Sequence, residues 1–137
     1  MPELRIDPLS GLRVIVAGER GSRPGAWLDV TPRPPIDREG DPFAAGHEDR
    51  TPPELYTLAG DNGSWRVRVV PNLYPALSAG EAEPGGDPLA GGRGEPDLFA
   101  SRPALGAHEV IVNAPDPVHS LAELDAGQVE SAMSVWR

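Results

Sequence analysis

Hydrophobic and polar positions alternate most clearly between Trp65 and Val70. Three apolar side chains there alternate with Arg66 and Arg68, and this period of two predicts a strand with one buried and one solvated face. Because a proline cannot donate a ladder hydrogen bond, we expect the strand to end near Val70, just before Pro71.

The segment after the strand, Asn72-Leu73-Tyr74, is bracketed by two prolines. Proline restricts the residue before it to extended conformations, so the segment is predicted to be a stiff loop. Such a loop holds the Asn72 amide, which both donates and accepts hydrogen bonds, in a fixed direction. The residues leave two interpretations open: the loop is a plain strand exit, or it forms one wall of a ligand site.

Two further runs rich in β-branched residues, 12–17 and 108–113, are predicted as strands. Residues 4–11 predict a short extended segment that enters a turn, because Asp-Pro and Ser-Gly pairs are typical of turns. The Asn-Gly pair within residues 60–63 predicts a turn that leads into the strand at 65–70.

A helix is predicted after Leu124, with Asp125 as its N-cap and Gln128 at the capping-box position. Four apolar positions then fall on one helical face, which we expect to pack on the core rather than bind a ligand: Val129, Ala132, Met133 and Trp136. This face continues to Trp136, the residue before the last, without a C-cap signal, so we expect the chain to be the N-terminal part of a longer fold.

The chain has 137 residues, the length of one domain, with 16 glycines, 17 prolines and 5% aromatic residues. Glycine and proline are concentrated in residues 78–104, which are predicted to be a disordered insertion within the domain 1–137. The long irregular connections and short apolar runs indicate an α+β fold with a small core.

The formal net charge of −9 argues against a nucleic-acid partner, which would need a basic surface. The absence of cysteine excludes disulfides and thiolate metal sites. No apolar run approaches the length of a membrane span, and the N-terminus lacks a signal-peptide pattern. We therefore expect a cytoplasmic protein that does not bind membranes.

Candidate binding chemistry begins with Arg20 and Arg23, three residues apart in a glycine-rich loop. Guanidinium groups suit phosphate oxygens, although two solvated loop arginines would give the same pattern. A second candidate is the acidic stretch that contains Asp41, His47, Glu48 and Asp49, which is compatible with hard metal ligands or with a hydrated turn. No P-loop, His-x-His pair or Ser-His-Asp arrangement is present.

Six segments, taken in order, resemble the N-terminal half of galactose-1-phosphate uridylyltransferases, nucleotidyltransferases of the histidine-triad superfamily. They are residues 2–11, 19–24, 42–54, 65–77, 108–112 and 120–124. The resemblance implies a histidine-triad-like antiparallel half-barrel sheet with one C-terminal helix, long irregular loops and an incomplete set of strands. It also implies a role in galactose metabolism: ping-pong transfer of UMP from UDP-glucose to galactose 1-phosphate through a uridylylated histidine.

The resemblance assigns nucleotide-binding roles to six residues: Arg20, Arg23, Arg50, Thr51, Asn72 and Leu73. In this assignment the first two arginines lie near the nucleotide phosphates, Arg50-Thr51 belongs to a uridine-side loop, and Asn72 contacts the nucleotide. Guanidinium groups that hold the phosphates and a rigid loop that orients a polar anchor fit this chemistry.

This chain departs from the family pattern at its chemical groups. The His-x-His nucleophile is absent, so no catalytic residue is assigned. The Cys-x-x-Cys zinc pair of the family falls on Asp41 and Ala44, and a third zinc-binding histidine falls near Pro117, two positions before His119. The resemblance therefore implies that the zinc site is lost and that no cofactor is bound.

We expect this N-terminal part to bind a UDP-sugar or nucleotide and a hexose 1-phosphate but to be inactive alone. Activity would then require a complementing C-terminal half or a homo-oligomer. Two alternatives stay open: a non-catalytic nucleotide-binding or partner-docking module, and a truncated gene product.

Overall fold

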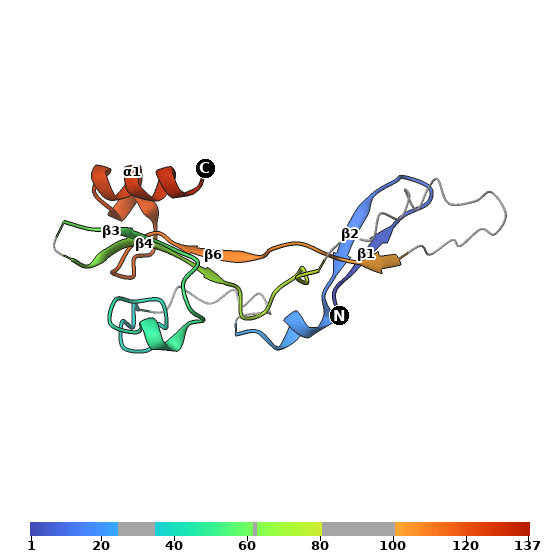
Figure 1. Ribbon diagram of the computed structural model, residues 1–137, viewed down its shortest axis with the longest axis horizontal. Helices are drawn as coiled ribbons and strands as arrows, with labels where there is room; N and C mark the ends of the chain where they lie inside the picture. The colour runs from blue at the N-terminus through green and yellow to red at the C-terminus, as the bar shows by residue number, and fades with distance from the viewer. Residues whose placement is uncertain (25–34, 62, 81–100) are drawn as a thin grey trace. The chain divides into compact units, whose positions relative to one another are not determined.

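The chain folds into two compact units in a computed structural model (Figure 1). The structure describes residues 1–24, 35–61, 63–80 and 101–137. The first unit comprises Met1–Asp29 and Tyr74–His108, and the second comprises Val30–Leu73 and Glu109–Arg137. Both units therefore combine an early and a late part of the chain.

The first unit contains a three-stranded antiparallel sheet in the order β2-β1-β5. Its central strand is β1 (Glu3–Ile6), which pairs with β2 (Arg13–Val16) and with β5 (Ser101–Pro103). The predicted turn after β1 is confirmed: the Asp7 carboxylate accepts a hydrogen bond from the Leu9 N–H at 3.0 Å. The 3₁₀ helix η1 (Gly18–Ser22) follows β2, so Arg20 lies in a short helical turn.

The second unit contains most of the buried apolar side chains and a sheet in the order β3-β4-β6. The strands are antiparallel: β3 (Tyr56–Ala59), β4 (Trp65–Pro71) and β6 (Glu109–Val112). The helix α1 (Ala126–Val135) packs against β4, and the 3₁₀ helices are η2 (Glu48–Arg50) and η3 (Leu121–Glu123) (Figure 1).

The predicted α+β class, with antiparallel sheet and one C-terminal helix, is confirmed. Strands occur within each of the three segments predicted from apolar patterns. They are divided between two small, open sheets. The strand β4 also includes Pro71, one residue beyond the predicted end, where it pairs with Glu109 of β6. A proline retains its carbonyl acceptor, so it fits at the end of a ladder.

The prediction of a solvated face at Arg68 is wrong. Arg68 is 1% exposed, whereas Arg66 is half-buried. Side-chain partners explain the burial: the Arg68 guanidinium donates to Thr51 and lies over the Trp65 ring. Arginine is the cation best suited to such sites, because its planar guanidinium is weakly hydrated and stacks on aromatic rings.

The buried face of α1 also differs from the predicted one. Gln128 and Ala132 are buried, while Met133 and Trp136 are 45% and 49% exposed. The Gln128 side chain does not form a capping box; its Nε2 donates to the carbonyl oxygens of Arg66, at 2.7 Å, and Asn113, at 2.6 Å. These two acceptors turn the Gln128 face of the helix toward the sheet.

The predicted disordered insertion, residues 78–104, lies mainly outside the described residues. At its two ends the structure shows ordered chain, because Ser78 forms a bridge with Leu105 and Ser101–Pro103 forms β5. The pairing of β5 with β1 brings this late strand into the N-terminal sheet. For residues 81–100 the disorder stays a prediction.

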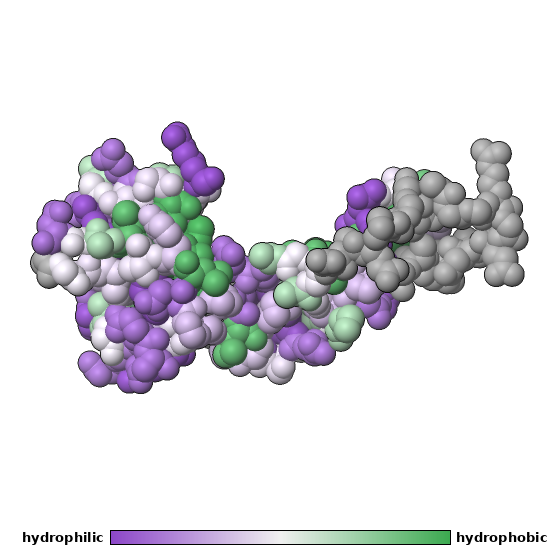
Figure 2. Space-filling view, viewed as in Figure 1, coloured by the Kyte–Doolittle hydropathy of each residue, from purple (hydrophilic) through white to green (hydrophobic). Residues whose placement is uncertain are grey.

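The visible surface of the second unit mixes hydrophilic and hydrophobic residues (Figure 2). Of the helices in the described ranges, none combines the length and the apolar character that a membrane span requires. The cytoplasmic location inferred from the sequence stays a prediction.

Candidate functional site

Arg20 is held in place by contacts within the first unit. Its Nη1 donates to the Tyr74 carbonyl oxygen at 2.8 Å and lies 3.2 Å from Nδ1 of His108. Both partners lie more than 50 residues away from Arg20 in sequence. Because Arg20 is half-buried and tied at one nitrogen, its guanidinium has a defined direction.

His108 joins Arg20 to the loop that follows β4. Its Nδ1 accepts a hydrogen bond from the Ala76 N–H at 2.8 Å and also faces the Arg20 donor. Since both neighbours are donors, Nδ1 serves as the acceptor. Sequence reasoning assigned no role to this histidine.

Arg23 ends the same helical turn and is exposed. Its backbone N–H donates to the Arg20 carbonyl oxygen at 3.2 Å, so the backbone relation between the two arginines is fixed. Their proximity within the first unit is compatible with a shared phosphate-binding surface. The predicted binding role of either side chain stays a prediction.

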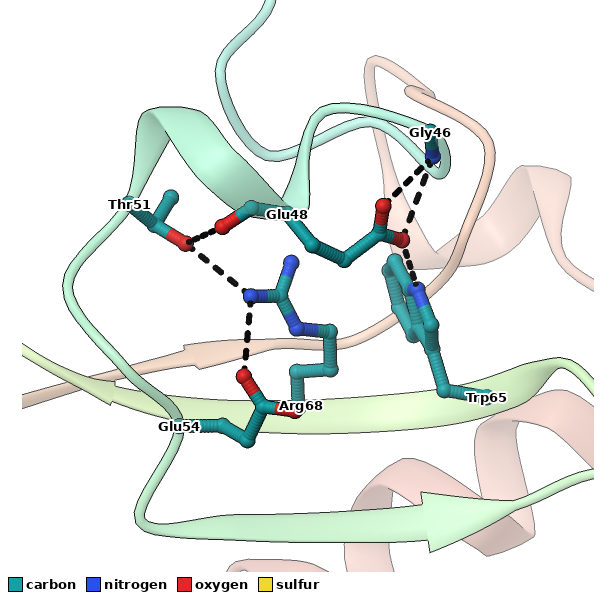
Figure 3. Close-up of polar contacts among 6 residues, drawn as sticks. All are labelled: Gly46, Glu48, Thr51, Glu54, Trp65 and Arg68. Atoms are coloured by element: carbon teal, nitrogen blue, oxygen red, sulfur yellow. Dashed lines mark hydrogen bonds and ion pairs between the residues drawn. The ribbon is translucent and has the colours of Figure 1, made fainter.

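In the second unit, the Glu48 carboxylate holds the loop before Arg50 and Thr51 (Figure 3). It accepts from the Gly46 N–H at 3.0 and 3.1 Å and from Nε1 of Trp65 at 2.6 Å. The hydrogen bond from Trp65 is the main reason that the Glu48 pKa falls to about 2; backbone hydrogen bonds and the Arg68 charge lower it further. The carboxylate is therefore ionised across the neutral range.

Thr51 is connected to β4 through Arg68 (Figure 3). Nη2 of Arg68 donates to Oγ1 of Thr51 at 2.9 Å and lies 3.6 Å from a Glu54 carboxylate oxygen. The guanidinium carbon lies 5.4 Å from the centre of the Trp65 ring, within the range of a cation–π contact. The Thr51 hydroxyl is thus a partner of a buried cation.

The other assigned residues of the second unit are more exposed. Arg50 is exposed and donates to the Glu39 carbonyl oxygen at 2.6 Å. Asn72 follows β4 and is half-buried, and Leu73 is 66% exposed. The second unit therefore contains four of the six assigned residues, while Arg20 and Arg23 belong to the first.

The positions that the resemblance assigns to zinc line one cavity of about 260 Å³ in the second unit: Asp41, Ala44, Pro117 and the nearby His119. Ala44 and Pro117 offer no side-chain donor, and the described residues contain no group of three His, Cys, Asp or Glu side chains placed to hold a metal. This donor set does not fit the tetrahedral site that zinc requires. The absence of zinc remains a prediction.

Direct protein contacts join the two sides of this cavity. The Ala45 N–H donates to the Pro115 carbonyl oxygen at 2.8 Å, and Arg38 forms an ion pair with Asp116. Nδ1 of His47 lies 2.7 Å from the Asp41 carbonyl oxygen. The side chains of His47 and Glu48 therefore stabilise the acidic loop, which favours the turn interpretation over the metal-ligand interpretation.

Three structural roles were not predicted from the sequence: Glu48 anchors a loop, Arg68 is a buried cation, and His108 is a partner of Arg20. One available signal was the position of His108 at the start of the predicted strand 108–113, where its side chain is close to a loop. Nothing local distinguishes Arg68 from Arg66, because both occupy alternate positions of one strand.

Comparisons with known proteins cover nearly the whole chain. A family model described as the N-terminal domain of galactose-1-phosphate uridyl transferase matches residues 1–137. An ADP-glucose phosphorylase of Arabidopsis thaliana is 33% identical over 131 residues, which are 93% of this chain and 34% of that protein.

Two solved structures are similar in fold. A uridylyltransferase mutant has a TM-score of 0.54 and 27% identity, over 97% of this chain and 31% of its own. A second uridylyltransferase has a TM-score of 0.53 and 24% identity, over 97% of this chain and 32% of its own. The present chain thus spans about a third of the length of these relatives.

Proposed function

The chain belongs to the family of the galactose-1-phosphate uridyl transferase N-terminal domain, and we propose that it is the nucleotide-sugar-binding part of a nucleotidyltransferase. The observation that carries the proposal is the restrained position of Arg20. Its Nη1 is occupied by the Tyr74 carbonyl and by His108, so the edge formed by Nε and Nη2 keeps a set direction. Bidentate recognition of phosphate oxygens depends on such an orientation.

The proposed ligand is a nucleoside diphosphate sugar. The resemblance assigns Arg20 and Arg23 to its phosphates, and it assigns Arg50, Thr51, Asn72 and Leu73 to the nucleoside. Because the overall charge is −9, the chain has no general positive field that would attract an anionic ligand. The attraction must therefore come from these individually placed groups.

The identity of the base and of the sugar in the ligand is a more specific question. The resemblance to uridylyltransferases implies UDP-glucose as donor and galactose 1-phosphate as acceptor, whereas the curated relative is named as an ADP-glucose phosphorylase. Both reactions involve a nucleoside diphosphate glucose. We therefore propose this class of ligand and leave the choice between uracil and adenine to a direct comparison.

Group transfer through a histidine requires a nucleophile that this sequence lacks. Its three histidines, His47, His108 and His119, include no His-x-His pair. The chain would hold the diphosphate in place, and a further segment would supply the attacking imidazole. Incubation with UDP-glucose and galactose 1-phosphate should therefore give no turnover; measurable turnover would refute the incompleteness.

Calorimetric titration with UDP-glucose and with ADP-glucose tests binding directly. We expect saturable binding of at least one of them, weakened about tenfold to a hundredfold by R20A, because a charge-assisted hydrogen bond to phosphate is lost. N72A should weaken binding as well. The matched control is R13A, which removes an exposed arginine of β2 and should leave the affinity unchanged.

A further inference from the structure

His108 receives two hydrogen-bond donors at a single ring nitrogen. The Ala76 N–H lies 2.8 Å from Nδ1, and Nη1 of Arg20 lies 3.2 Å from the same atom. The donors belong to segments 32 and 88 residues away in sequence. One acceptor atom therefore joins the η1 turn to the loop after Tyr74, entirely within the first unit.

We propose that His108 is a positioning residue for Arg20, which it holds in the direction needed to bind the diphosphate of a nucleotide sugar. This inference rests on the proposed function. His108 itself touches the arginine and the loop, so its contribution to binding acts through them.

Preorganisation is the physical basis of the effect. An arginine side chain has many rotamers, and part of this rotamer entropy must be lost when it binds a ligand. Contacts with the Tyr74 carbonyl and with His108 remove part of this freedom before the ligand arrives, which strengthens binding. An unrestrained Arg20 would lose that rotamer entropy during binding, which would weaken the affinity for the ligand.

The contrast between asparagine and leucine separates positioning from simple packing. In H108N the amide Oδ1 stands two bonds from Cβ, as Nδ1 does in histidine, so the acceptor is retained. In H108L a side chain of similar bulk remains but the acceptor is gone. H108Q moves its acceptor one bond further out and serves as a polar control.

Titration of the full chain with UDP-glucose and with ADP-glucose gives the first readout. We expect H108L to weaken binding about tenfold, because Arg20 would no longer be oriented before the ligand arrives, and H108N to stay within about threefold of wild type. In the R20A background H108L should have no further effect, because both changes remove the same interaction. H119L, at an exposed histidine of the second unit, is the matched control.

Two results would overturn the inference: H108N as weak as H108L, or the same loss from H108L in the R20A and wild-type backgrounds. If H108L fails to show a cooperative melting transition, the comparison of H108N with H108Q replaces it, with H108Q expected to bind more weakly.

A second readout keeps this inference separate from the proposed function. The Nε–H resonance of Arg20 in ¹H–¹⁵N spectra of the unliganded chain should show restricted motion in wild type and H108N, and averaged motion in H108L. Flat titrations with both nucleotide sugars would overturn the proposed function. An Arg20 signal equally mobile in all three proteins would overturn the positioning role of His108.

Discussion

Arg68 carries a charge into the interior of the second unit, where only 1% of its surface is exposed. Burial of a cation is costly unless it is paired, and here the Thr51 hydroxyl, the Glu54 carboxylate and the Trp65 ring surround the guanidinium. Its Nε and Nη1 atoms are buried without a hydrogen-bond partner among the described residues. The contacts therefore specify where Thr51 lies more than they add stability.

Glu48 gives this arrangement a dependence on pH. Its pKa falls from 4.5 to about 2 because of the hydrogen bond from Trp65 and two backbone N–H groups, so the ionised form is favoured in the folded state. A lowered carboxyl pKa contributes stability that is present above the unfolded value and lost as the pH falls toward the folded value. The contribution should therefore decline between about pH 5 and pH 2.

We expect E48Q to be less stable than wild type by about 1 kcal/mol at neutral pH, since charge-assisted hydrogen bonds weaken and the site is partly screened by solvent. Urea unfolding of both proteins from pH 2 to pH 7 measures the difference. It should shrink to near zero at the acid end. A difference that is constant with pH would show that ionisation of Glu48 plays no part.

At the scale of elements, Gln128 joins α1 to the sheet. Its amide donates to the carbonyl oxygens of Arg66 and Asn113, and its Oε1 accepts from Nε of Arg66 at 3.3 Å. The helix begins with the Asp125 carboxylate, which accepts from the Gln128 N–H at 2.8 Å. One residue thus takes part in both the start of the helix and its packing.

Replacement of this contact should destabilise the second unit. We expect Q128L to lower the free energy of unfolding by about 2 kcal/mol, because two partly buried carbonyl groups lose their donors. E130Q, at an exposed position of the same helix, should change it by less than about 0.5 kcal/mol. Urea denaturation followed by circular dichroism measures both, and an equal effect of the two variants would contradict the role of Gln128.

Local sequence patterns predicted where the strands and the helix lie better than they predicted which distant residues contact each other. The alternation at 65–70 gave the position of β4, and the Asp125 cap gave the start of α1, because both depend on neighbours in sequence. The burial of Arg68 and Gln128 depends on Thr51, Arg66 and Asn113, which lie 15 to 62 residues away. No periodicity reveals such partners.

At the scale of the whole molecule, sequence alone reached the family through ordered short motifs, and the family match over residues 1–137 confirms it. The missed strands β3 and β5 are short, with four and three residues. β5 lies within a glycine- and proline-rich stretch that hides its pattern. The division of the strands into two sheets depends on pairings such as β1 with β5, across nearly 100 residues of sequence.

Metal independence is expected of the whole fold. The loop around Asp41 and the segment around Pro115 are joined by a backbone hydrogen bond and by the Arg38–Asp116 ion pair. Dialysis against EDTA should therefore leave the melting temperature unchanged, and added zinc should not raise it. A lower melting temperature in EDTA, restored by zinc, would show that a metal site exists.

We propose that this chain binds a nucleoside diphosphate sugar through Arg20. Calorimetric titration of wild type, R20A and R13A with UDP-glucose and ADP-glucose tests it most directly. We expect saturable binding that R20A weakens about tenfold or more and that R13A leaves unchanged. Flat titrations with both sugars, or equal affinities of wild type and R20A, would contradict it.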